Sequence, residues 1–144
     1  MRIVVDTNIA FSAILNTDSK IGTILLQPKS RLNFYSTDQL LSEIKEHSDK
    51  LLKLTKKSES ELNTSINLIT RRIRFINPQI IPSQIFTEAS ELTSGVDIDG
   101  CEFVALTEHI KGRFWSGDKE LINGLILKKW NRFIDTNELY RLIK

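Results

Sequence analysis

Two carboxylates in this chain follow short runs of strand-forming residues, where the reactive groups of a parallel sheet are usually found. Asp6 comes directly after the run Arg2–Val5 in the stretch IVVDTNIAFSAIL. Asp118 follows the run Arg113–Trp115 in the stretch FWSGDKELINGL. Because parallel sheets bind ligands at the carboxyl ends of their strands, we expect both acids at one edge of the sheet.

Three further acids could reach the same cleft. Glu43 lies early in a predicted helix, and Asp97 and Asp99 lie in GVDIDGCEF just before another helix. Several carboxylates in one cleft repel one another and cannot all stay ionised without a cation. Carboxylate oxygens select hard cations such as Mg²⁺ or Mn²⁺, and a pair of these ions can activate water and stabilise the leaving oxygen of a phosphodiester. The pattern therefore indicates metal-dependent phosphodiester hydrolysis.

Each acid also has a purely structural interpretation. Asp6 and Asp118 are both placed to cap the helix that follows, as aspartate often does. Glu43 has the pattern of a solvated helical residue. Asp99 forms an Asp-x-x-Glu variant of the capping box with Glu102, so its structural and metal-binding interpretations have equal weight.

The elements that must position these acids alternate between short strands and helices. Strands are predicted at Arg2–Val5, Asn33–Tyr35, Arg74–Ile76, Arg113–Trp115 and Arg132–Ile134. Helices are predicted at Ile9–Leu15, Ile21–Leu26, Asp38–Leu54, Ser83–Leu92, Glu102–Ile110 and Lys119–Lys129, with two more starting after Ser58 and Asp135. Such alternation predicts an α/β fold with a mainly parallel sheet.

Three capping-box pairs mark helix starts: Ser36 with Gln39, Ser58 with Glu61, and Asp135 with Glu138. The helix over 38–54 and the one that follows Ser58 each carry an apolar stripe, and we expect them to pack as a hairpin. The second stripe comprises Leu62, Ile66, Ile69 and Ile73.

The composition is that of an ordinary globular protein. The 144 residues favour a single domain over 1–144, and the net charge of +2 permits a nucleic-acid partner without arguing for one. One cysteine, Cys101, excludes an internal disulfide and fits a reducing compartment. The N-terminus lacks a signal-peptide pattern, and no apolar run reaches the roughly 18 residues that cross a bilayer. We therefore expect a cytoplasmic location.

Four stretches resemble the motifs of a known family, in order and in spacing. IVVDTNIAFSAIL, LLSEIKEH, DIDGCEFVAL and FWSGDKELINGL are similar to the motifs of PIN-domain ribonucleases, and most similar to those of the VapC-type toxin branch. The resemblance covers nearly the whole chain. It implies a three-layer α/β/α sandwich, RNA cleavage with Mg²⁺ or Mn²⁺, and commonly a homodimer. In toxin members, an antitoxin protein fills the acidic cleft.

The resemblance also implies roles for individual residues. Asp6 matches the family's first metal-binding acid, Glu43 the helix-borne second acid, and Asp118 the acid after the fourth strand. Asn8 matches the usual neighbour of the first acid, and Ser116 the hydroxyl that accompanies the last. Both would orient ligands or water.

The chain departs from the family at the third acid. Relatives usually carry Asp at the position that is Gly100 here, whereas Asp99 is one residue earlier and Asp97 three residues earlier. Either aspartate could replace the missing ligand, or the site could be weakened. A domain that binds RNA or a protein without cutting is therefore the alternative to a nuclease.

Other functional classes have less support. His47 and His109 show no zinc-type spacing and are predicted to lie on the surface or at a rim. Phosphatases of the haloacid dehalogenase type need a second Asp two residues after the first, and that position is Asn8 here.

Overall fold

The computed structural model describes residues 1–28 and 31–144. Its strands are β1 (Arg2–Val5), β2 (Asn33–Thr37), β3 (Ile73–Ile76) and β4 (Arg113–Trp115). Its α-helices are α1 (Thr7–Leu15), α2 (Lys20–Leu26), α3 (Asp38–Glu46), α4 (Ser48–Leu54), α5 (Glu59–Thr70), α6 (Ser83–Thr93), α7 (Cys101–Ile110), α8 (Lys119–Leu127) and α9 (Thr136–Ile143). Two short 3₁₀ turns are η1 (Pro78–Ile80) and η2 (Ile98–Gly100).

The four strands form a parallel sheet in the order β3-β2-β1-β4. After β1 the chain first adds β2 and β3 on one side and then crosses to add β4 on the other. The strand order therefore reverses between β1 and β4, and ligands of such sheets bind in the crevice beyond that point.

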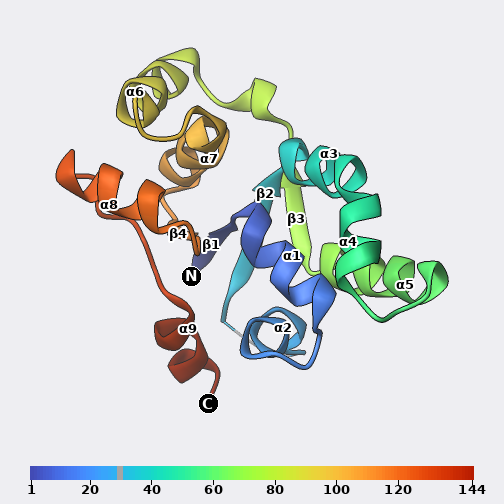
Figure 1. The fold of residues 1–144 in the computed structure, drawn as a ribbon. Coiled ribbons are helices and arrows are strands. Elements are labelled where there is room, and N and C mark those ends of the chain that lie inside the picture. The colour runs from blue at the N-terminus through green and yellow to red at the C-terminus, as the bar shows by residue number, and fades with distance from the viewer. Residues whose placement is uncertain (29–30) are drawn as a thin grey trace.

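Helices cover both faces of the sheet, which confirms the predicted three-layer α/β/α architecture. Figure 1 shows α1, α2, α4 and α5 on one side of the sheet and α6, α7 and α8 on the other. The strand residues Ile3, Val4 and Val5 are fully buried, as expected for a strand covered on both faces.

The sequence-based boundaries needed two corrections in the elements around the sheet. The predicted helix over 38–54 is interrupted at His47, because His47 and Ser48 are poor interior helix residues and serine favours a helix start. The predicted strand Arg132–Ile134 is wrong, since only Phe133 forms an isolated bridge to Phe114.

Helix packing also differs from the expectation. We expected α5 to pack as a hairpin against the helix over 38–54, which the structure divides into α3 and α4. Instead, α5 packs chiefly against α1. Its stripe ends earlier than predicted, and Ile73 begins β3 instead of extending the helix.

Two of the three capping boxes are confirmed. Ser58 with Glu61 and Asp135 with Glu138 form reciprocal pairs at the starts of α5 and α9. The pair Ser36 with Gln39 is wrong, because Ser36 lies within β2 and its hydroxyl donates to the Val5 carbonyl. The side chain of Gln39 therefore makes no capping bond with Ser36 and faces the carboxyl edge of the sheet instead.

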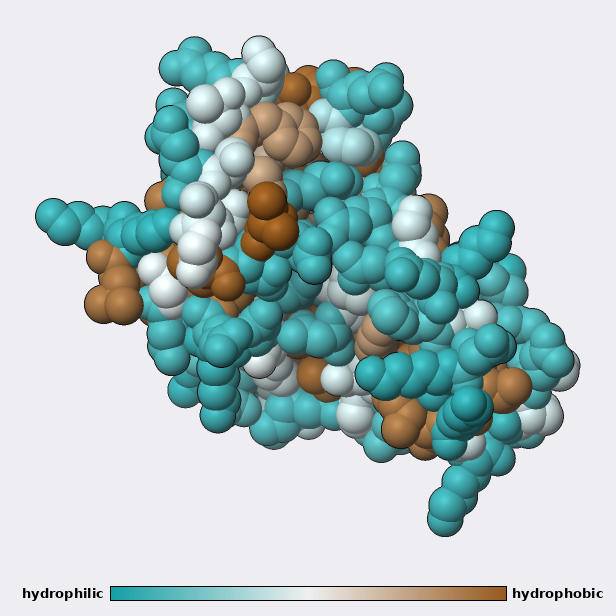
Figure 2. Space-filling model, turned by 45° about the horizontal axis from the view of Figure 1, so that its top comes forward, coloured by the Kyte–Doolittle hydropathy of each residue, from teal (hydrophilic) through white to brown (hydrophobic). Residues whose placement is uncertain are grey.

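The surface in Figure 2, which is turned toward the carboxyl ends of the strands, is mostly hydrophilic, with hydrophobic side chains in separate small groups. Among the described residues, none of the helices combines the length and apolar character needed to span a bilayer.

Candidate active site

The ends of β1 and β4 bring Asp6 and Ser116 together. Val5 pairs with Trp115, and the Asp6 amide donates to the Trp115 carbonyl at 3.1 Å. The Ser116 hydroxyl donates to Oδ2 of Asp6 and accepts from the Asp118 amide at 3.1 Å. One buried hydroxyl therefore fixes the side chain of the first acid and the backbone of the last.

Replacement of Ser116 by alanine should destabilise the protein by about 1–3 kcal/mol, because it leaves Oδ2 of Asp6 and the Asp118 amide without their partner. The free energy of unfolding from urea titration measures this loss. Ser42→Ala, on the exposed face of α3, is the matched control and should cost nothing. Equal stability of the two variants would show that the Ser116 bridge contributes little.

Asp6 and Asp118 both cap helices, so their structural interpretation is confirmed. Oδ1 of Asp6 accepts from the Thr7 amide at 2.8 Å, and Oδ1 of Asp118 accepts from the Leu121 amide at 3.2 Å. A carboxylate has about four acceptor positions, so capping leaves room for a cation. Asn8 lies beside them, and its Oδ1 accepts from the Gly117 amide at 3.3 Å.

The turn before α7 separates the two aspartates that the sequence left as alternatives. Asp97 is half-buried and accepts from the Asp99 amide at 3.0 Å, which caps η2, whereas Asp99 is exposed. Helix α7 begins at Cys101 with Gly100 as its N-cap residue, so the predicted box between Asp99 and Glu102 is wrong.

Gly100 is buried and lies against α8. A Cβ atom at this position would be 3.2 Å from both Cδ atoms of Leu121, a tight contact with the end of a flexible side chain. The backbone itself, with φ −80° and ψ −9°, suits any residue. An aspartate at this position would therefore require a small shift of the Leu121 side chain but would meet no backbone strain.

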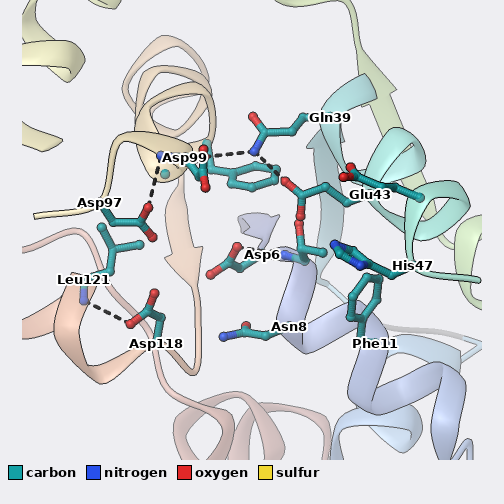
Figure 3. A pocket seen from close by; sticks show the side chains of 14 residues that line it. Asp6, Asn8, Phe11, Gln39, Glu43, His47, Asp97, Asp99, Asp118 and Leu121 are labelled. Atoms are coloured by element: carbon teal, nitrogen blue, oxygen red, sulfur yellow. Dashed lines mark hydrogen bonds between the residues drawn. The ribbon is translucent and has the colours of Figure 1, made fainter. Parts of the chain in front are cut away.

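A pocket with a volume of 490 Å³ lies beyond the carboxyl ends of the strands, and Asp6, Asn8, Asp97 and Asp118 are among its lining residues. Its lining contains no Lys or Arg among the described residues, but six carboxylates. They belong to Asp6, Glu43, Glu46, Asp97, Asp99 and Asp118. In Figure 3, Asp6, Asp97 and Asp118 face one another, while Glu43 approaches from α3 on the opposite side.

The lining residues that sequence reasoning missed include Gln39, Glu46 and Phe11. Gln39 and Glu46 are four residues before and three residues after Glu43, and this spacing on a helix was the available signal. Phe11 contacts His47 edge-to-face with 5.9 Å between ring centroids. The exposed His47 lies at the mouth of the pocket, as predicted for a rim residue.

The pocket opposes ionisation of Asp6 and Asp97. Burial raises the pKa of Asp6 to about 6, and the charges of Asp118 and Glu43 add to this effect, while hydrogen bonds from Ser116 and Thr7 oppose it. Burial also raises the pKa of Asp97, and the charges of Asp118 and Asp99 act in the same direction, while the hydrogen bond from the Asp99 amide opposes it. Acids from separate elements are thus close enough to repel one another electrostatically.

The donor set suits a hard divalent cation, because six carboxylates gather with no Lys or Arg among the described lining residues to neutralise them. The Thr7 hydroxyl, which belongs to a lining residue, is buried without a hydrogen-bond partner in the described part of the chain. Within residues 1–28 and 31–144, no three His, Cys, Asp or Glu side chains already lie as a coordination set. A bound ion would therefore require these side chains to rotate toward one another.

Comparisons with known proteins agree with this architecture. A chain in the crystal structure of VapBC2 from Rickettsia felis, bound to a DNA fragment from their promoter, is similar over 94% of this chain and 97% of that chain, with a TM-score of 0.66 and 12% sequence identity. At this identity the likeness shows the fold. No curated protein sequence matches significantly. The family model of the PIN domain matches residues 4–136, and the chain therefore belongs to the PIN-domain family.

Proposed function

We propose that this protein is a metal-dependent endoribonuclease of the VapC toxin type, which hydrolyses RNA phosphodiesters with Mg²⁺ or Mn²⁺. The observation that carries the proposal is the pocket at the reversal of strand order, where six carboxylates converge without a Lys or Arg among the described lining residues. Membership of the PIN-domain family supports the same chemistry.

In this proposal Asp6, Glu43, Asp97 and Asp118 hold the cation, and Asp99 assists from the exposed side of the turn. When bound, the cation supplies charge neutralisation and lowers the pKa of bound water. Ser116 orients Asp6 through its hydroxyl bond. In a nuclease, the carboxylates would also repel phosphate in the absence of metal, so substrate binding would depend on the ion.

We further propose an antitoxin partner that covers the acidic pocket, a homodimeric assembly, and a cytoplasmic location. The fold similarity to VapBC2 supports the antitoxin partner. A Lys or Arg side chain from such a partner would pair with carboxylates that have neither residue type in the described lining.

The direct test is RNA cleavage in the presence of Mn²⁺, comparing the unmodified chain with Asp6→Asn. We expect cleavage only by the unmodified chain. Equal cleavage by both proteins would end the assignment.

The specific feature that favours a second function is Gly100, which removes one acid from the usual set. The alternative is a domain that binds RNA or a protein partner without cutting. If Asp97 serves as the replacement ligand, then Gly100→Asp should change Mn²⁺-dependent cleavage by less than about 3-fold, well below the roughly 10–100-fold expected when a needed metal partner changes.

The control for Gly100→Asp is the double variant with Leu121→Val, which makes room for the new Cβ atom. Melting temperatures measured for both variants separate poor folding from poor chemistry. An unmodified chain that is inert, together with a variant that cuts RNA, would establish the non-cutting alternative.

A further inference from the structure

Gln39 joins the two sides of the acidic pocket. It lies in the first turn of α3, four residues before Glu43, so the two side chains share one helix face. Its Nε2 donates to Oε1 of Glu43 at 2.7 Å and to the backbone carbonyl of Asp99 at 2.9 Å. Figure 3 shows both bonds, with the Gln39 amide between α3 and the turn that carries Asp97.

The orientation of the amide follows from its partners. Both neighbouring groups are acceptors, and the NH₂ group of glutamine has two donor hydrogens. The reverse orientation would place the Gln39 oxygen against a carboxylate and a carbonyl, which repel it. The amide can therefore use its two hydrogens at once, one on each side of the pocket.

Three consequences follow for the site. The bond to Oε1 restricts the rotation of Glu43 and leaves Oε2 for another ligand. The second bond satisfies the backbone carbonyl of Asp99. The backbone amide of the same residue donates to the side chain of Asp97. The side-chain amide of Gln39 thus sets the separation between Glu43 on α3 and the turn before α7, in which Gly100 takes the place of an acid.

We infer that Gln39 is a positioning residue for the metal site, which aligns Glu43 with Asp97 across the pocket. This inference rests on the proposed metal-dependent function. The competing explanation is a Gln–Glu pair that only stabilises α3. That explanation predicts no effect on the turn before α7 and none on metal affinity.

The test uses Gln39→Met, which keeps the side-chain length and removes both donors. Gln84→Met, at an exposed position in the first turn of α6, is the matched control. In metal-free protein we expect faster amide hydrogen exchange in residues 97–101 for Gln39→Met, with α5 and α9 unchanged. Unchanged exchange in residues 97–101 would overturn the bridge.

Calorimetric titration with Mn²⁺ then measures the positioning role. We expect Gln39→Met to bind Mn²⁺ about 10–100-fold more weakly, the usual effect of removing a group that orients a metal ligand. Excess Mn²⁺ should restore RNA cleavage, because the defect lies in affinity. Unchanged affinity in Gln39→Met, in a chain that itself binds Mn²⁺, would overturn the inference and leave the proposed function standing.

A double-mutant cycle with Glu43→Gln identifies the route of the effect. If Gln39 acts through Glu43, then Gln39→Met should weaken Mn²⁺ binding by less than about 2-fold in the Glu43→Gln background, since the two changes share one interaction. Full additivity would overturn the inference. An unmodified chain that neither binds Mn²⁺ nor cuts RNA would instead reject the proposed function, and with it the positioning role.

Discussion

Asp6→Asn should lower Mn²⁺-dependent RNA cleavage by at least about 100-fold, more than the 10–100-fold typical of groups that only support a metal ligand. Asn keeps an oxygen that can accept from the Thr7 amide, and its NH₂ group can pair with Ser116, so the local fold should survive. Cleavage of a radiolabelled RNA by the two proteins, at equal concentration and saturating Mn²⁺, measures the effect. Asn8→Asp is not a suitable control, because it would add a carboxylate to the same pocket.

The same substitution should stabilise the metal-free protein at neutral pH. Burial raises the pKa of Asp6 to about 6 from 3.8, so above pH 6 the folded state holds a charge that it disfavours relative to the unfolded state. The corresponding penalty is at most about 3 kcal/mol, from 1.36 kcal/mol for each pKa unit. Asp6→Asn, which removes the charge, should raise the free energy of unfolding by up to that amount.

The sign of this effect depends on pH. Between about pH 4 and pH 6 the folded state binds the proton of Asp6 more tightly than the unfolded state, so the stability of the unmodified chain falls as pH rises. The advantage of Asp6→Asn should therefore be absent below pH 4, grow up to pH 6, and stay constant above. Urea titrations at pH 4 and pH 7.5 in EDTA measure it, and a variant that is less stable at both values would contradict this account.

Mn²⁺ should reverse the order of stability. An ion that binds only the folded unmodified chain at 1,000 times its dissociation constant adds about 4.1 kcal/mol, which exceeds the advantage of about 3 kcal/mol or less that Asp6→Asn has without metal, while Asp6→Asn gains little from the ion. The unmodified chain alone should then melt at a higher temperature with Mn²⁺ than with EDTA. Gathering acids in one pocket lowers the stability of the metal-free protein, and ion binding restores it. This behaviour is expected of a metal site and not of a helix cap.

The parts of this fold that were predictable are those set by local pattern. The run Arg2–Val5 predicted a buried strand, and the residue after it had to lie at the carboxyl edge. The boxes starting at Ser58 and Asp135 were readable because the paired residues satisfy backbone groups of their own helix.

The failures have tertiary causes. Arg132–Ile134 has the composition of a strand, and the Arg132 carbonyl and the Ile134 amide both bond to Phe114 of β4, but the pairing is only one bridge long, at Phe133. Ser36 has the spacing of a cap, but its position inside β2 directs its hydroxyl to the Val5 carbonyl. Gln39 was assigned to the cap for the same reason, and its role in the pocket became visible only when the Asp99 carbonyl was placed beside it.

The second large effect concerns the acid that replaces the one missing at Gly100. We expect Asp97→Asn to lower Mn²⁺-dependent cleavage by at least about 10-fold, since loss of a group that holds the ion should cost no less than loss of one that only supports a ligand, and Asp99→Asn to lower it by less than about 3-fold. The structure separates the two residues, because Asp97 is half-buried opposite Asp118 whereas Asp99 is exposed. Each variant is the matched control for the other, since both remove one charge from one turn.

The position of Asp97, half-buried opposite Asp118, also explains its elevated pKa. Burial raises this pKa, and the charge of Asp118 adds to it, which places the two carboxylates close enough to compete for a proton or to share a cation. Asp97→Asn also keeps an oxygen for the Asp99 amide, so the cap of η2 can persist and a loss of cleavage would reflect lost charge. A larger loss in Asp99→Asn would mean that the turn rearranges when the ion binds, and would transfer the ligand role from Asp97 to Asp99.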